Sequence, residues 1–262
     1  MPVKTRGEVF AVPSADPVVP AAAIDSMQIV PQPSTDQEDP LVAPARTAPR
    51  RRGRPREPVL STGRITDAAI RIVTTRGYSH LTMTELAREL KVSTSALYNH
   101  TSSKREVLIR VQDRINEGID CSGFGTLPWD EALERWARSY RDIYARHTPL
   151  IPIMAVLPVA NAPHTLQMYE TVARGLAGAG WQQGWIVNTI VAVESLVFGA
   201  AYDATAPADI FDPGERADLA PVFTEAVRAR PEDASAAADE AFDVALGSML
   251  DGFRARLAAA RG

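Results

Sequence analysis

From about residue 61 onward, apolar residues recur three and four positions apart, the spacing of one face of an α-helix. The first such stripe consists of Ile65, Ala68, Ala69, Ile72 and Val73. No segment of any length alternates apolar and polar residues as a half-buried strand does, so the pattern predicts an all-α fold. The helices are expected over residues 64–75, 83–90, 94–100, 104–121, 128–147, 163–179, 183–203, 213–228 and 232–260, with a short apolar helix between Pro149 and Pro158.

Polar residues at the starts of several of these segments fit helix caps. Thr82-Met83-Thr84-Glu85 and Ser103-Lys104-Arg105-Glu106 match the capping box, in which the first hydroxyl and the last carboxylate each bond a free amide. Ser93 fits an N-cap and Gly77 a C-cap, and Pro128 fits the first position of a helix. The caps therefore support the boundaries that the apolar pattern indicates.

Two of the predicted helices are short and are joined by the four-residue turn Glu89-Leu90-Lys91-Val92, which indicates a helix-turn-helix. Their expected packing contacts are Leu86, Ala87, Leu90, Val92 and Leu97. The second helix can then turn its outer face to the major groove of DNA, which is wide enough for one helix. We expect DNA contacts from Thr82, Thr84, Thr94, Ser95, Ala96, Tyr98, Asn99, His100 and Lys104. Tyr98, His100 and Lys104 suit phosphates, and the small and amide side chains suit base edges.

The charge along the chain is arranged in blocks. The net charge of the whole chain is −4, but residues 1–45 carry 2 basic and 6 acidic side chains, residues 46–115 carry 15 and 6, and residues 116–262 carry 11 and 20. The basic block coincides with the predicted helix-turn-helix, which indicates an anionic partner at that part of the molecule.

The segment before the helices divides into a tail and an arm. Residues 1–49 are rich in proline and show no helical period, so we expect a disordered tail. Residues 50–58 form a basic arm in which Arg52-Gly53-Arg54-Pro55 resembles the core of an AT-hook, whose arginines lie in a narrow minor groove. Arg52 and Arg54 are therefore further candidates for DNA contact, and the alternative is a solvated linker. The DNA-binding domain is expected over residues 59–121 and a second helical domain over 122–262.

Composition argues against several other classes of protein. Cys121 is the single cysteine, so neither a disulfide framework nor a thiolate metal cluster is expected, and its side chain suits a packed small hydrophobe better than a redox sensor. The stretch Trp185–Ala201 is interrupted by polar residues and reads as too short and too polar for a membrane span. No signal peptide and no catalytic motif is visible. We expect a cytoplasmic, nucleoid-associated protein that is not an enzyme and has no cofactor or metal.

The amino-acid sequence of residues 61–115 resembles the DNA-binding domain of the tetracycline-repressor (TetR) family. The resemblance is carried by Gly77-Tyr78, Leu81-Thr82-Met83, Leu86-Ala87-Arg88-Glu89-Leu90-Lys91-Val92-Ser93, Ala96-Leu97-Tyr98-Asn99-His100 and Ser103-Lys104-Arg105-Glu106-Val107-Leu108. Residues from Tyr169 to Gly199 are similar, more loosely, to the tetracycline-repressor type of C-terminal domain. Two positions depart from the family: Lys91 stands where it usually has Gly in a left-handed turn, and Thr101 stands where an apolar residue is frequent.

This resemblance implies a homodimer that binds a palindromic operator and is released by a small-molecule effector. The two long helices over residues 183–203 and 232–260 are the expected dimer bundle. Magnesium-tetracycline binding is not implied, because Pro158 or Val159 falls where some relatives have the chelating histidine, and His164 is several residues away.

Effector contacts are expected between the helices of the C-terminal half, where proteins of this kind bind apolar ligands. The candidates are Trp136, Tyr140, Met154, Met168 and Asn188. Glu194, within an apolar stretch, is either a partly exposed or interface carboxylate or a residue of the ligand pocket. His147 and His164 are alternatives for effector or metal contact, although each fits a surface or capping role.

Three other hypotheses remain open at this point. The chain could be an activator or an orphan regulator of the same family. It could also be an architectural protein that binds DNA through the arm without regard to sequence. A helical enzyme or binding module is disfavoured, because the acidic half shows no site chemistry.

Overall fold

A computed structural model describes residues 60–260 of the chain, and residues 1–59 and 261–262 lie outside the described part. The predicted tail and the arm with Arg52 and Arg54 therefore lie outside the described residues. Within residues 60–260 every regular element is helical, and the one recorded β contact is an isolated bridge between Phe124 and Leu127. The all-α prediction is confirmed for this part of the chain.

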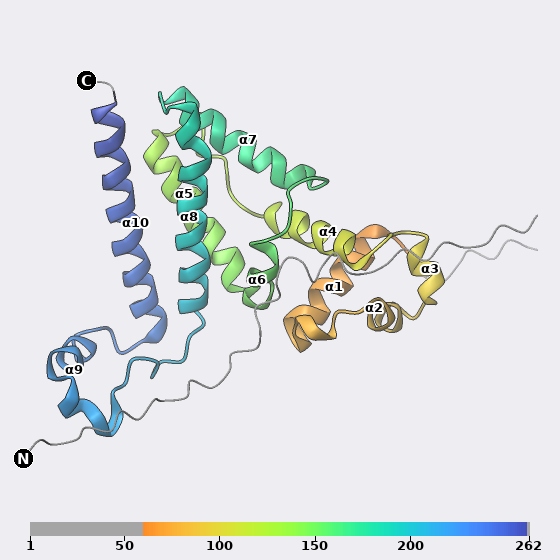
Figure 1. The fold of residues 1–262 in the computed structure, drawn as a ribbon, viewed down its shortest axis with the longest axis horizontal. Helices are drawn as coiled ribbons and strands as arrows, with labels where there is room; N and C mark the ends of the chain where they lie inside the picture. Colours follow the sequence, from red (N-terminus) through yellow and green to blue (C-terminus); the bar gives the residue numbers. More distant parts are fainter. Residues whose placement is uncertain (1–59, 261–262) are drawn as a thin grey trace, which may run out of the picture. The chain divides into compact units, whose positions relative to one another are not determined.

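The N-terminal helices pack through apolar side chains that belong to one core, continuous with that of the C-terminal helices (Figure 1). These elements are α1 (Thr62–Arg76), the 3₁₀ turn η2 (Tyr78–His80), α2 (Met83–Leu90), α3 (Thr94–Tyr98) and α4 (Lys104–Asn116). The stripe predicted for the first helix is fully buried, with Ile65 and Ile72 among its members. Hydroxyl N-caps begin four of these helices: the oxygens of Ser61, Thr82, Ser93 and Ser103 accept backbone amides.

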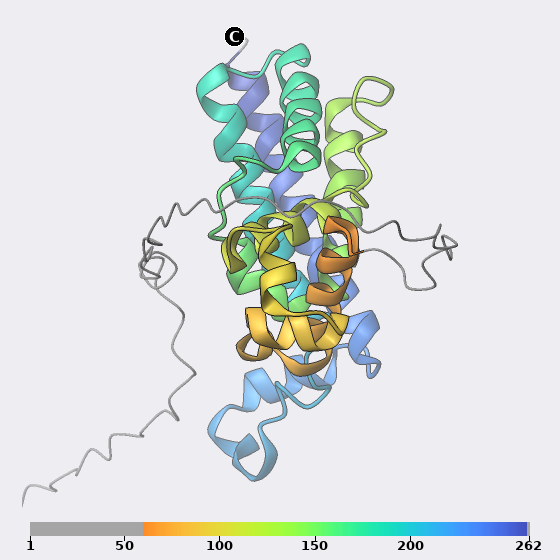
Figure 2. The same ribbon diagram turned by 90° about the vertical axis from the view of Figure 1, so that its right-hand side faces the viewer.

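The remaining helices form the C-terminal domain (Figure 1, Figure 2). They are α5 (Trp129–Ala145), η3 (Thr148–Leu150), α6 (Ile151–Met154), α7 (Pro163–Gly178), α8 (Gln183–Asp203), η4 (Gly214–Leu219), α9 (Pro221–Arg228) and α10 (Ala234–Ala259). Helix α8 packs against α5, α7 and α10, and α4 packs against both α1 and α7. Because α4 contacts both domains, it joins the helix-turn-helix to the C-terminal helices.

Two predicted helices differ from the structure. Helix α4 ends at Asn116 instead of continuing to Cys121, because the chain turns against α5: the backbone amide of Asp120 donates to Ser139 Oγ at 2.9 Å. The segment predicted as one helix over residues 213–228 is divided into η4 and α9 at Ala220, where φ is −140° and ψ is 62°. Pro221 explains this break, since a residue before proline avoids helical backbone angles.

Helix α8 has the bounds predicted from the sequence, residues 183–203, but the expectation about its suitability as a membrane span differs. The helix spans 21 residues and contains an 18-residue window with a mean hydropathy of 1.5, so by length and composition alone it could cross a membrane, and the expectation that this stretch is too short and too polar was wrong. In the structure one face of the helix, including Ile186, Val193 and Val197, is buried against neighbouring helices of the same domain. The opposite face carries Val187 and Val191, which are 65% and 52% exposed.

Candidate nucleic-acid interface and ligand site

The turn between α2 and α3 adopts a left-handed conformation at Lys91. This conformation was expected, because the resembling family usually has glycine at this position. Lys91 has φ 56° and ψ 42°, and the following amide of Val92 donates to the carbonyl of Ala87 at 3.0 Å. This bond closes the end of α2 in the manner of a left-handed C-cap. Leu86 and Leu97 are buried beneath the turn, so α2 and α3 pack as predicted and the helix-turn-helix is confirmed.

The outer face of α3 is open to solvent. Thr94, Ser95, Tyr98 and Asn99 are exposed, with Tyr98 49% exposed, while Ala96 and His100 are half-buried. Ser93 begins the helix, and its hydroxyl accepts the amide of Ala96 at 3.1 Å. The predicted contact residues on α3 therefore form one accessible, polar surface around a buried Leu97. Thr82 and Thr84 at the start of α2 are exposed as well.

The start of α4 places a lysine beside a ring. Lys104 Nζ lies 3.9 Å from the centroid of the Tyr78 ring, and burial lowers the pKa of Lys104. Thr101, the second departure from the family, is buried below this helix start, and its hydroxyl bonds the carbonyl of Ser103 and the carboxylate of Glu106, each at 3.2 Å. A polar residue is accommodated there because the N-terminal turn of α4 supplies polar partners.

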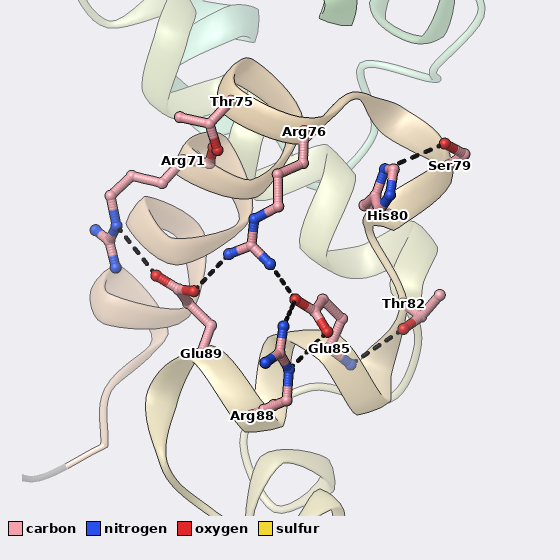
Figure 3. Close-up of polar contacts among 9 residues, drawn as sticks. All are labelled: Arg71, Thr75, Arg76, Ser79, His80, Thr82, Glu85, Arg88 and Glu89. Carbon is pink, nitrogen blue, oxygen red and sulfur yellow. Dashed lines mark hydrogen bonds and ion pairs between the residues drawn. The ribbon is translucent and has the colours of Figure 1, made fainter.

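An ion-pair network fastens α1 to α2, and sequence reasoning missed it (Figure 3). The guanidinium of Arg76 lies between Glu85, with which it is paired, and Glu89 at 2.7 Å, while Arg88 Nε donates to Glu85 Oε2 at 2.9 Å. Arg71 Nε is 3.7 Å from Glu89 Oε1. The hydrogen bond from Arg88 is the largest cause that lowers the pKa of Glu85.

This network changes the predicted capping boxes. Thr82 Oγ1 accepts the amide of Glu85 at 3.0 Å, but the Glu85 carboxylate binds arginines instead of returning to the first amide. Likewise, Ser103 accepts the amide of Glu106, whereas Glu106 Oε2 accepts the amide of Ser102 at 2.6 Å. Each box is thus half formed, and its carboxylate serves a different contact.

In the C-terminal domain, four of the five predicted effector residues lie in the core. Trp136, Tyr140, Met154 and Met168 are buried members of one apolar cluster. Asn188 is exposed, and its amide donates to the carbonyl of Gly184 on the same helix at 3.3 Å. A cavity of about 220 Å³ between α4 and α7 includes Met168 in its lining; the others are Asn116, Glu117, Ile119, Cys121, His164, Gln167 and Thr171.

Glu194 joins α8 to two neighbouring helices. Its Oε1 accepts hydrogen bonds from Tyr140 Oη on α5 at 2.9 Å and from Tyr169 Oη on α7 at 2.5 Å. Burial raises the pKa of the Glu194 carboxyl, and burial is also the largest cause that raises the pKa of Tyr140. Its contacts therefore lie among α5, α7 and α8 of one chain, and its role in a ligand pocket stays a prediction.

A second polar cluster joins α4 to the start of α7. Asp113 Oδ1 accepts the backbone amide of Thr165 at 2.9 Å, and Asp113 Oδ2 lies 2.8 Å from His164 Nδ1. Nearby, the side-chain amide of Asn116 makes two hydrogen bonds. Its Nδ2 donates to Thr165 Oγ1 at 3.1 Å, and its Oδ1 accepts from Tyr144 Oη at 2.8 Å. Ala162, the N-cap residue of α7, has no side chain that can cap, so Asp113 supplies this cap from α4.

The two histidines that were alternatives for ligand or metal contact have different surroundings. The hydrogen bond to Asp113 is the largest cause that raises the pKa of His164, and burial lowers the pKa of His147. Within residues 60–260, no group of three or more His, Cys, Asp or Glu side chains is placed to hold a metal ion. His164 is therefore explained by its contact with Asp113.

The chain matches two family models. Residues 65–111 match the model described as bacterial regulatory proteins, tetR family, and residues 125–257 match the model described as tetracyclin repressor-like, C-terminal domain. Among curated relatives, the HTH-type transcriptional repressor DrrR1 of Streptomyces coeruleorubidus is 29% identical over 153 residues, which are 58% of this chain and 56% of that repressor. An HTH-type transcriptional regulator of Saccharopolyspora erythraea is 26% identical over 177 residues, 68% of this chain and 73% of the relative.

Solved structures share the fold. The Streptomyces coelicolor TetR family protein ActR in complex with actinorhodin has a TM-score of 0.63 at 22% identity, covering 76% of this chain and 99% of ActR. A TetR variant from Acinetobacter baumannii AYE in complex with minocycline has a TM-score of 0.57 at 23% identity, with coverage of 76% and 99%. BioQ with its double-stranded DNA operator has a TM-score of 0.51 at 24% identity, with coverage of 77% and 99%.

Proposed function

The chain belongs to the TetR family of bacterial regulatory proteins, and from this premise we propose that it is a homodimeric repressor that leaves a palindromic operator when a small molecule binds its C-terminal domain. Members of the family are transcriptional regulators and not enzymes. The observation that carries the proposal is the exposed polar face of α3, held over buried Leu97 by the left-handed turn at Lys91. DrrR1 is itself called a transcriptional repressor, which supports repression over activation. Because a repressor acts on DNA, we also propose a cytoplasmic, nucleoid-associated location.

On DNA, the residues of this face are proposed to divide between bases and phosphates. Asn99 and the small residues Thr94, Ser95 and Ala96 face the base edges, while Tyr98, His100 and Lys104 face phosphates. Thr82 and Thr84 supply further phosphate contacts from the start of α2. The BioQ complex with its double-stranded operator, which shares this fold, supports DNA as the partner.

Selection of bound sequences from a random pool of double-stranded DNA tests sequence-specific binding, and a protected palindrome in a footprint supports the regulator. Uniform protection along A·T-rich DNA would instead indicate an architectural protein. In binding assays, Tyr98→Ala and Lys104→Ala are expected to weaken binding to all sequences, whereas Asn99→Ala changes the sequence preference by about 1–3 kcal/mol at one base pair. Arg228→Ala, which removes an exposed positive charge on α9, is the control. Equal losses of affinity for the Tyr98, Lys104 and Asn99 variants on every sequence would contradict the division of these residues between phosphates and bases.

The dimer interface is proposed on the exposed faces of α8 and α10. Val187 and Val191 on α8 and Val244 on α10, itself 65% exposed, are apolar side chains that a second copy would cover. Sedimentation of the full chain tests the dimer. The double variant Val191→Glu/Val244→Glu is expected to be monomeric and to lose operator affinity, whereas Val156→Glu, at an exposed valine outside both helices, leaves the dimer intact.

The effector is proposed to bind among α5, α7 and α8, with Trp136, Tyr140, Met154 and Met168 around it and Asn188 near the mouth of the site. Binding would release DNA if the ligand prefers one of two spacings of the recognition helices. ActR bound to actinorhodin and the TetR variant bound to minocycline, which share this fold, support a small-molecule ligand. Release of the selected operator in a screen of small molecules tests this step, and an orphan regulator would give no hit.

The basic arm is proposed to add affinity through Arg52 and Arg54 in the minor groove. If it neutralises about three phosphates, deletion of residues 50–56 lowers the slope of log affinity against log salt by about 0.9 per phosphate. An unchanged slope would show that the arm has no part in binding.

A further inference from the structure

Glu194 is a half-buried carboxylate whose partners are neutral. It lies in the long, predominantly apolar helix α8, and its partners are the hydroxyls of Tyr140 and Tyr169, both on the same oxygen, Oε1. Within residues 60–260, no lysine, arginine or histidine forms an ion pair with it. The second oxygen, Oε2, has no recorded partner in this region.

Such a carboxylate is unfavourable in the absence of a positive charge. Removing an ionised carboxyl from water carries a large desolvation penalty that neutral donors offset only in part. The pKa of Glu194 reflects this balance, since burial raises it more than the two hydroxyl bonds lower it. A positive charge brought to Oε2 by a bound molecule would supply the missing counter-ion.

Aromatic rings surround Tyr140, one of the two partners of Glu194. The ring of Tyr140 lies 5.4 Å from that of Trp136, 5.0 Å from that of Tyr144 and 5.7 Å from that of Phe198, measured between centroids. Aromatic faces attract cations, most strongly where water is excluded. In addition, Trp136 Nε1 is a buried donor without a hydrogen-bond partner among the described residues.

We propose that the effector of this regulator carries a protonated amine on an aromatic or otherwise apolar frame, and that Glu194 is the counter-ion of that amine, held in position by Tyr140 and Tyr169. This inference rests on the proposed ligand-binding function of the C-terminal domain and names the chemical class of the ligand. Tyr140 is almost completely buried, whereas Tyr169 and Glu194 are half-buried, so the amine reaches the carboxylate from the side of α7. Anionic ligands are disfavoured, because they would meet a half-buried negative charge.

The site also has a physical connection to the DNA-binding domain. Tyr144 stands one helical turn after Tyr140 on α5 with the two rings in contact, and its hydroxyl donates to Asn116 on α4 at 2.8 Å. A ligand that displaces the Tyr140 hydroxyl from Glu194 therefore acts on Tyr140, whose ring contacts Tyr144. Tyr144 is in turn hydrogen-bonded to Asn116 at the end of α4. Because α4 packs on α1 as well, movement at this contact reaches the helix-turn-helix.

The test compares 2-(1-naphthyl)ethylamine with its neutral N-acetyl derivative by calorimetric titration of the full chain at pH 7.5. The two probes share their aromatic frame and differ in charge. The unmodified protein is expected to bind the amine about tenfold more tightly than the amide or better, a difference of about 1.4 kcal/mol. Glu194→Gln, which retains an acceptor for the tyrosines but removes the charge, is expected to abolish most of this preference. Glu225→Gln, at an exposed carboxylate on α9, retains it.

Equal affinity of the unmodified protein for the two probes, or binding of neither at millimolar concentration, overturns the inference, and both results are obtained without any variant. A preference that survives Glu194→Gln overturns the assignment of Glu194. Selection of DNA sequences by the same preparation separates this inference from the proposed function. If a palindrome is selected but the amine is not preferred, only the ligand class is wrong; if no sequence is selected, the proposed function itself fails.

Discussion

Asp113 makes the most informative contact between the two domains, because one carboxylate on α4 caps the start of α7. Its Oδ1 accepts the amide of Thr165 at 2.9 Å, and Thr165 is fully buried, so water cannot replace the lost acceptor. The first turn of α7 otherwise depends on Pro163, which has no amide to satisfy, and on Ala162, which cannot cap. We expect Asp113→Ala to loosen α4 from α7 as well as to destabilise the fold.

The expected loss can be worked from these contacts. Removal of an N-cap costs about 1 kcal/mol where water can replace the acceptor, whereas a buried amide left without an acceptor costs about 1–3 kcal/mol. Because the amide of Thr165 is of the second kind, Asp113→Ala should lower the free energy of unfolding by about 2 kcal/mol, and by no more than about 3 kcal/mol. Asp233→Ala is the matched control, because Asp233 also caps a helix, α10, through the amide of Ser235 at 3.0 Å, but at an exposed position. Its expected cost is the capping loss alone, about 1 kcal/mol.

The measurement is urea unfolding of the full chain followed by far-UV circular dichroism, with all proteins at one concentration because a dimer's stability depends on it. Operator affinity is measured in parallel, and a loss is expected for Asp113→Ala but not for Asp233→Ala. If Asp113→Ala costs no more than Asp233→Ala, the carboxylate is an ordinary cap and does not join α4 to α7.

Three further substitutions or reactions probe single features of the fold. Gly175→Ala on α7 should lower the free energy of unfolding by about 1–3 kcal/mol, because an added Cβ would collide with the ring of Phe124, whereas Gly178→Ala on the same helix meets open space and should be neutral or stabilising in the same urea assay. Lys91→Gly should raise stability by about 0.5 kcal/mol, since the relief of left-handed backbone strain exceeds the added flexibility of glycine; a loss of more than about 1 kcal/mol would contradict this balance. Cys121, whose pKa burial raises to about 11, should react slowly with iodoacetamide at pH 8 and faster only as the pH approaches that value, and rapid labelling at pH 8 would show that the thiol is more accessible than its position implies.

The sequence was most informative where structure is decided by neighbouring residues. The left-handed turn and the caps by Thr82, Ser93 and Ser103 depend on contacts within a few positions, and each was predicted. The end of α4 was misjudged because its cause is distant: nothing between Asn116 and Cys121 stops a helix except Gly118, and it is Ser139, on α5, that accepts the amide of Asp120.

The candidate ligand site shows the same limit. Trp136 and Tyr140 were predicted to lie between the helices of the C-terminal half, and both are buried there, but their spacing could not tell which polar group Tyr140 meets. The bonds of Glu194 to Tyr140 and Tyr169 join residues 54 and 25 positions apart, and that between Asp113 and Thr165 spans 52. Periodicity describes one helix at a time, so it identifies which face is buried but not what that face meets.

The positive charge of the DNA-binding domain has a consequence that only the structure reveals. Residues 60–115 contain nine Lys and Arg and five Asp and Glu, and Arg71, Arg76, Arg88 and Arg110 are each paired with a glutamate of the same domain. An arginine in such a pair attracts phosphate less strongly, because its charge is already compensated nearby. Much of the domain's basic charge therefore stabilises its own helices. If the arm binds DNA as proposed, the arginines of residues 50–56 contribute a large share of the attraction for DNA, so deletion of that arm should reduce affinity more than its length alone suggests.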